Sequence, residues 1–188
     1  MKQSILNSLT IVLLLLLPVE KTFGQLPELV AKNEKAVFSI YTYDEYGSAN
    51  GMGTGFFIDG KGIGFTNYHV LEGATKAVIK LTDKSVYEID KIIAADADAD
   101  VVKFSVKNFD SRTFSYLTLK TTQPLKGSDI FVIGNPEGFE NTVSEGIVSS
   151  IREIEGFGDI IQITAPISPG SSGSPVMTMD GKVVGIAT

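Results

Sequence analysis

A serine flanked by glycines is the first candidate for chemistry in this chain. Ser172 lies in the stretch Pro169-Gly-Ser-Ser-Gly-Ser-Pro175, between two apolar runs. A serine hydroxyl is a weak nucleophile that needs a base to take its proton and donors that stabilise the oxyanion it creates. Gly170 allows a backbone turn in which its own N–H and that of Ser172 point at one spot. Taken alone, the stretch is more typical of a Ser/Gly turn between two strands.

A single histidine and a run of aspartates precede this loop. His69 is the only histidine in the chain, and it follows a short apolar stretch. Asp100 ends the run Asp96-Ala-Asp-Ala-Asp100 and stands directly before the apolar pair Val101-Val102. A lone histidine is more often structural than catalytic, and an acidic run is usually a solvated loop. Their significance therefore depends on their order relative to Ser172.

The order histidine, aspartate, serine is the chain order of the chymotrypsin-type catalytic triad, not of the subtilisin or α/β-hydrolase triads. In such a triad Ser172 would attack a carbonyl carbon. His69 would take the serine proton and return it to the leaving amine, while Asp100 would hold the imidazole in the required tautomer. The three residues together predict a hydrolase that forms an acyl-enzyme.

The composition of the 188 residues excludes several other kinds of site. There is no cysteine, so disulfides, zinc–thiolate sites and a cysteine nucleophile are ruled out, and one histidine cannot make a multi-histidine metal site. We expect no metal and no cofactor. The net charge of −6 makes nucleic acid or an anionic membrane surface a poor partner.

The first 24 residues have the pattern of a secretory signal peptide. Lys2 gives a positive start, Ile11 to Leu17 is an unbroken apolar run, and Thr22-Phe-Gly24 offers small residues for a signal peptidase. We expect cleavage after Gly24 and a periplasmic or secreted bacterial protein. The alternative is an uncleaved anchor, but the apolar run is short for a bilayer, so we expect no stable membrane insertion after cleavage.

Short strands dominate the patterns in the rest of the chain. We expect one helix at 26–35 and a helical turn at 71–75. Asp180-Gly181 is a strong hairpin signal between the last two runs. Many short strands with glycine turns predict an all-β barrel or sandwich. The expected strands span 36–43, 51–59, 63–66, 77–81, 86–94, 101–106, 114–119, 129–134, 142–154, 159–165, 175–179 and 182–187.

The sequence resembles trypsin-like serine proteases of the HtrA/Deg kind, which have the chymotrypsin fold. The resemblance runs from about Val37 to Thr188. Four segments carry it, with the patterns of the glycine-rich strand, the T-N-x-H-V box, the aspartate before an apolar strand and the G-[NS]-S-G-[GS]-P loop. They are Gly53–Ile58, Thr66–Val70, Asp100–Lys103 and Gly170–Pro175, with Gly134–Pro136 and Thr142–Ser149 in further family positions.

The resemblance implies the roles of individual residues. Ser172 would be the nucleophile, His69 the base and Asp100 the acid, with the N–H groups of Gly170 and Ser172 as the oxyanion hole. Among the alternatives Asp96, Asp98, Ser171 and Ser174, none has the flanking residues that the family motifs require. The floor of the substrate pocket would be Pro166 and Ile167. Because neither is acidic, we expect cleavage after small or medium apolar residues.

The resemblance also implies the organisation of the chain. We expect a protease domain over residues 25–188, made of two antiparallel six-stranded β-barrels at about 36–106 and 121–188, joined by a linker at about 107–120. In the family a further strand follows the position of Thr188, so we expect the second barrel to be incomplete.

The predicted function is a serine endopeptidase acting on exported or unfolded polypeptides, and the chain could form a homo-oligomer. One alternative is a weakly active or inactive protease fold that binds peptides as a chaperone module. A further alternative is another serine hydrolase, such as an esterase. The absence of βαβ patterning argues against it.

Overall fold

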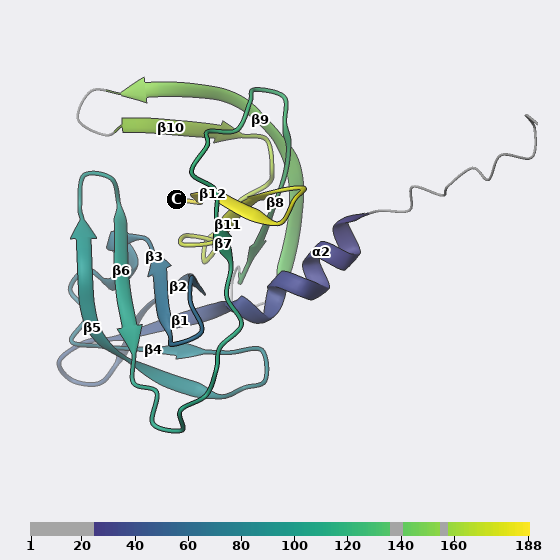
Figure 1. Cartoon of the computed structure of the whole chain (residues 1–188). Coiled ribbons are helices and arrows are strands. Elements are labelled where there is room, and N and C mark those ends of the chain that lie inside the picture. The colour runs from purple at the N-terminus through teal and green to yellow at the C-terminus, as the bar shows by residue number, and fades with distance from the viewer. Residues whose placement is uncertain (1–24, 136–140, 155–157) are drawn as a thin grey trace, which may run out of the picture.

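The computed structural model describes residues 25–135, 141–154 and 158–188. It shows two β-sheets that lie one above the other, with the C-terminus between them (Figure 1). The expected signal peptide lies outside the described residues. Within them, no helix is long and apolar enough to cross a membrane.

The N-terminal half is a closed antiparallel barrel with the strand order β1-β2-β3-β6-β5-β4. Alternation along β6 shows why these segments form strands, because Val102, Phe104 and Val106 are buried while their neighbours are only partly so. The strands are β1 Val37–Tyr43, β2 Ala49–Phe57, β3 Ile63–Thr66, β4 Lys76–Lys80, β5 Val86–Asp96 and β6 Val101–Val106.

The C-terminal half is an open, curled six-stranded sheet with the order β10-β9-β8-β11-β12-β7. The predicted fold class is confirmed, with a closed first barrel and an open second one. One pair departs from the antiparallel expectation, since β12 pairs with β7 in parallel. The strands are β7 Thr118–Leu119, β8 Asp129–Gly134, β9 Thr142–Ile154, β10 Gly158–Ile163, β11 Pro175–Thr178 and β12 Lys182–Ile186.

Three apolar clusters form the core, and one of them joins the two halves. One fills the first barrel around Phe38, Ile79 and Phe104, and another lies within the second sheet. The third, which we call the shared cluster, contains residues from both halves and is covered by α2 (Gln25–Asn33) through Leu26, Leu29 and Val30. The buried members of the shared cluster are Ala36, Val37, Phe56, Leu117, Phe131, Ile133, Met177 and Val183.

One expected strand is wrong over most of its length. Of residues 114–119 only Thr118–Leu119 form a strand, in the stretch expected as linker. The apolar residues Phe114 and Leu117 are buried against the first barrel, where their N–H groups donate to the carbonyls of Gly60 and Phe57. A connecting segment can therefore bury large side chains without joining a sheet. The helical turn expected at 71–75 instead spans Tyr68–Leu71 as α3.

Candidate active site

His69 lies on the short helix α3, directly after β3. The next residue, Val70, is buried and fixes the helix on the barrel. Gly53 on β2 makes room for this contact, because a Cβ there would lie 2.8 Å from both Val70 methyl groups and 3.2 Å from the Ser172 carbonyl oxygen. Helix α3, which we call the histidine helix, and the loop at 169–175, which we call the serine loop, therefore meet over Gly53. The imidazole itself remains 47% exposed.

Asp100 is held beside His69 by an unusual backbone conformation. Its φ of +51° is uncommon for a residue other than glycine. The side-chain amide of Asn67 donates to the Asp100 carbonyl oxygen at 2.8 Å and supports this conformation. Asp96 instead accepts a bond from the Ala99 N–H, and Asp98 lines a hollow nearby. The carboxylate that contacts His69 is that of Asp100.

Three donors converge on the Asp100 carboxylate. The His69 backbone N–H lies 3.0 Å from Oδ1, and His69 Nδ1 lies 2.8 Å from Oδ2. The Thr188 hydroxyl donates to Oδ2 at 2.8 Å. Because a carboxylate only accepts, Nδ1 must carry the proton, which leaves the Nε2 lone pair of the neutral ring free to act as a base.

These bonds lower the pKa of the Asp100 carboxyl below its usual value. Partial burial opposes ionisation, but the His69 N–H, the Thr188 hydroxyl and the His69 ring together outweigh it. Asp100 therefore stays ionised at neutral pH, which is the state that orients the imidazole.

The serine loop alternates bonded and free N–H groups. Ser171 N–H donates to Ser168 at 2.9 Å, and Gly173 N–H donates to Ala187 at 2.9 Å. The N–H groups of Gly170 and Ser172 donate to no residue that the structure describes. Gly170 has a φ of +92°, which suits glycine alone. Both free donors belong to the residues predicted as the oxyanion hole.

The Ser172 hydroxyl also makes no hydrogen bond with any described residue, His69 included. Catalytic hydrogen bonds in ligand-free sites are often long and tighten only with substrate. The structure thus places Ser172 close to the histidine helix without a formed bond between the two side chains.

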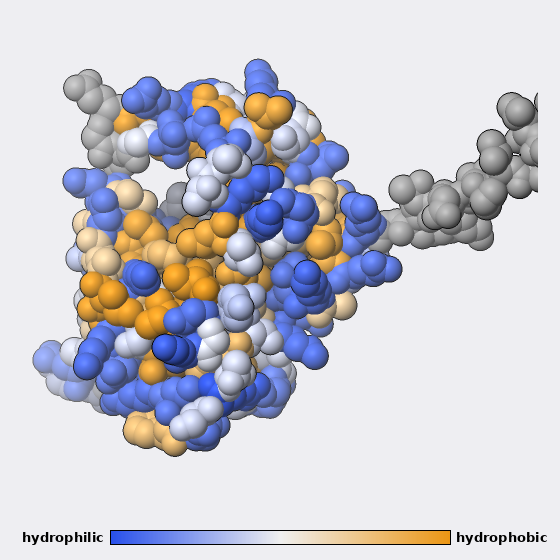
Figure 2. Space-filling view, viewed as in Figure 1, coloured by the Kyte–Doolittle hydropathy of each residue, from blue (hydrophilic) through white to orange (hydrophobic). Residues whose placement is uncertain are grey.

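The two predicted pocket residues lie in different hollows. Pro166 lines a cavity of about 340 Å³ together with Ser171 and Glu145. Ile167 lines a larger hollow of about 550 Å³ between the halves, with Asp100 and the strands β10 and β12. Figure 2 shows apolar surface gathered there on this face. Their adjacent positions in the sequence gave no indication that the two side chains line different hollows.

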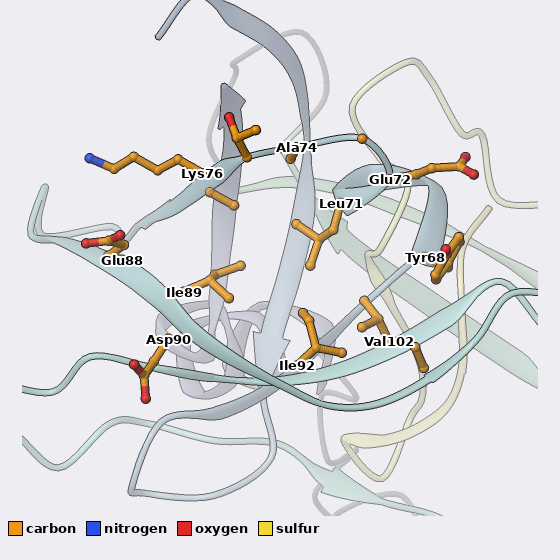
Figure 3. A pocket seen from close by; sticks show the side chains of 14 residues that line it. Tyr68, Leu71, Glu72, Ala74, Lys76, Glu88, Ile89, Asp90, Ile92 and Val102 are labelled. Carbon is orange, nitrogen blue, oxygen red and sulfur yellow. The ribbon is translucent and has the colours of Figure 1, made fainter. Parts of the chain in front are cut away.

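A third hollow, of about 370 Å³, lies beside α3 on the first barrel. Leu71, Ile89 and Ile92 point into it, while Glu88 and Asp90 stand at its edge (Figure 3). Its lining includes none of the three predicted triad residues.

Sequence reasoning missed two residues that support the site, Thr188 and Thr54. Thr188 contacts Asp100 across 88 positions, and Thr54 contacts Gly170 across 116. In the sequence, Thr54 was included only as a member of the segment Gly53–Ile58, with no role of its own. No local signal marks such long-range bonds, because threonine is also an ordinary strand residue.

Residues 53–186 match the model of the trypsin-like peptidase domain. A probable periplasmic serine endoprotease, DegP-like, from Pseudomonas fluorescens is 37% identical over 76% of this chain and 30% of its own length. The anti-sigma-I factor RsgI9 of Acetivibrio thermocellus is 35% identical over 90% of this chain and 24% of its own.

The crystal structure of Deg5 has the same fold, with a TM-score of 0.77 and 29% identity over 90% of this chain and 87% of that one. The chain spans about a third or less of the length of the two curated relatives. The domain match shows that this chain belongs to the trypsin-like peptidase family, and its sequence and fold are similar to those of HtrA-type serine proteases.

Proposed function

We propose that the chain is a serine endopeptidase that cleaves exported or unfolded polypeptides through an acyl-enzyme. The observation that carries this proposal is the set of three donors on Asp100, which fixes the His69 tautomer with Nε2 free. In this proposal Ser172 is the nucleophile, His69 the general base and Asp100 the orienting acid.

The reaction then follows from these roles. Ser172 Oγ bonds to the carbonyl carbon of the scissile peptide, and its proton passes to His69 Nε2. The oxyanion accepts from the free N–H groups of Gly170 and Ser172. His69 gives its proton to the departing amine, and water attacks the acyl-enzyme with the same base, which restores the Ser172 hydroxyl.

The substrate preference and location are also proposed. The hollow that contains Ile167 is mainly apolar and favours small or medium apolar side chains before the cleaved bond. If a basic side chain entered this hollow, the carboxylates of Asp98 and Asp159 would be the groups that could pair with it. Export to the periplasm agrees with the name of the Pseudomonas relative. A substrate profile dominated by Lys or Arg before the cleaved bond would refute the apolar preference.

A second function is a peptide-binding or regulatory module without turnover. Two observations favour it: the unformed bond between Ser172 and His69, and the name of the anti-sigma factor that matches most of this chain. Such a module would keep the fold and bind extended peptides, but it would not need an activated serine.

Labelling with a fluorophosphonate probe, read by intact mass, separates the two functions. The endopeptidase proposal expects one added probe in the purified chain, none in Ser172→Ala, and full labelling in the neighbouring control Ser174→Ala. Degradation of a fluorescein-labelled unfolded protein should depend on Ser172 in the same way. If the chain binds that unfolded protein but does not cleave it and is not labelled by the probe, the peptide-binding module is the correct function.

A further inference from the structure

Thr54 on β2 joins the first barrel to the serine loop of the second half. The residue is fully buried. Its hydroxyl donates to the Gly170 carbonyl at 2.8 Å and accepts from the Asn135 N–H at 3.0 Å. Its backbone N–H donates to the Ser172 carbonyl at 2.8 Å. One residue therefore contacts both positions whose N–H groups remain free.

The direction of the hydroxyl bond is fixed by its partners. The Asn135 N–H can only donate, so the Thr54 oxygen must accept from it. The hydroxyl proton is directed at the Gly170 carbonyl oxygen. A loop that turned an N–H toward Thr54 instead would remove this acceptor and leave the hydroxyl proton of a fully buried residue without that partner.

This contact explains the alternation of N–H groups in the loop. The carbonyls of Gly170 and Ser172 both point toward Thr54. Between and after them, the N–H groups of Ser171 and Gly173 point to Ser168 and Ala187. With these groups fixed inside the protein, the N–H groups of Gly170 and Ser172 are the ones left for an oxyanion.

We propose that Thr54 is a positioning residue, whose hydroxyl and N–H hold the serine loop in the conformation that leaves the Gly170 and Ser172 N–H groups free. It acts through the loop and does not touch substrate. Its catalytic consequence rests on the endopeptidase proposed above, whereas its effect on the loop does not.

Three variants test this role. Thr54→Val keeps the branched shape and removes the hydroxyl, and Thr54→Ser restores the hydroxyl. Thr178→Val is the matched control, because it removes another buried hydroxyl that bonds Asp180 and the Lys182 carbonyl, at the β11–β12 turn away from the loop.

The first readout is amide hydrogen exchange measured by NMR, which needs no activity. We expect exchange at Ser171 and Gly173 to speed up at least tenfold in Thr54→Val relative to the amide of Phe104 on β6. Thr54→Ser and Thr178→Val should exchange as the unchanged chain does. Equal protection of Ser171 and Gly173 in Thr54→Val would overturn the proposal.

The second readout is peptide hydrolysis. We expect Thr54→Val to lower kcat by roughly ten- to a hundredfold with KM changed less than about twofold, because a misaligned oxyanion donor loses part of the roughly hundred- to thousandfold that complete removal of one donor costs. Thr54→Ser should recover most of kcat. If the unchanged chain has no activity, the proposed function fails, and the exchange result still decides the role of Thr54. A fall in kcat that Thr178→Val shares equally would count against a positioning role.

Discussion

At the scale of single residues, the site depends on how completely the Asp100 carboxylate is bonded. Its backbone lies in the left-handed region and is supported by Asn67, and its oxygens receive the three donors described above. Each donor stabilises the ionised form, and two of them come from His69 itself. The orientation of the imidazole and the charge of its partner are therefore set by one group of contacts.

Thr188 should matter for turnover more than for folding. Thr188→Val removes the hydroxyl that donates to Asp100 Oδ2, so the pKa of Asp100 should rise toward its usual value. We expect kcat to fall roughly three- to tenfold with little change in KM, since one hydrogen bond to a charged group is lost at a partly exposed position. Steady-state kinetics measures this, with Thr188→Ser as the rescuing control. Unchanged kcat in Thr188→Val would contradict the role.

Gly173 should tolerate no side chain. Its φ is +89°, and a Cβ would lie 1.9 Å from the Thr54 carbonyl oxygen. We expect Gly173→Ala to lower the free energy of unfolding by about 3 kcal/mol or more, from overpacking and backbone strain. Gly47 has a similar φ of +77° but nothing within 4 Å. Urea unfolding of Gly47→Ala should show only the backbone cost of about 1 kcal/mol, and equal losses would disprove the clash.

At the scale of elements, alternation and turn residues predicted most strands well. β3, β6, β8 and β9 begin and end where the sequence indicated. The strand expected at 114–119 was wrong over most of its length, because Phe114 is buried in the cluster of the first barrel and Leu117 in the shared cluster, without either residue pairing in a sheet. The triad residues could be proposed from their types and order. The bonds of Thr54 and Thr188 could not, since they join positions that only the folded chain brings together.

The connection between the halves is tied to the first barrel by an ion pair. Arg112 donates to Asp83 at 2.6 Å, and Ser85 donates to the same carboxylate with its hydroxyl and its N–H. The Ser85 hydroxyl bond is the largest of the effects that lower the pKa of Asp83 to about 2, followed by the Ser85 N–H and Arg112. The turn after β4 and the segment at 108–112 are thus held together by charge.

Stability should respond to pH through Asp83. Since its folded pKa lies below the ordinary 3.8, its contribution is complete above about pH 4 and is lost as pH falls toward 2. The Asp83–Arg112 pair is about half exposed, so solvent screening weakens it. Asp83→Asn should therefore lower the free energy of unfolding by about 1 kcal/mol at pH 7 and by almost nothing near pH 2. Urea unfolding at pH 7, 4 and 2.5 measures this. The same loss for Asp83→Asn at every pH would show that ionisation is not responsible.

At the scale of the whole molecule, the two halves share one apolar cluster and one site. Val37 and Phe56 from the first barrel pack with Phe131 and Met177 from the second sheet. The serine loop is bonded to β2, and Asp100 is bonded to Thr188, which follows β12. Separation of the halves would expose the cluster and dismantle the site together, so the site requires both halves to be folded.

Unfolding should therefore be one transition for both halves, and the tyrosines allow a test. The six tyrosines lie between positions 41 and 116, so their fluorescence reports the first barrel and its connection, while far-UV circular dichroism reports both halves. Met177 is fully buried on β11. Met177→Ala should cost about 2–5 kcal/mol through the cavity it leaves.

If the shared cluster couples the halves, Met177→Ala moves the tyrosine and circular dichroism transitions to the same lower urea concentration, although no tyrosine lies in the mutated half. Leu125→Ala, at a residue that is 79% exposed in that half, should move neither. A tyrosine transition that stays in place while circular dichroism splits into two steps would mean that the first barrel folds alone. In that case the shared cluster would stabilise the second half only, and the serine loop could detach from a histidine and aspartate that remain in position.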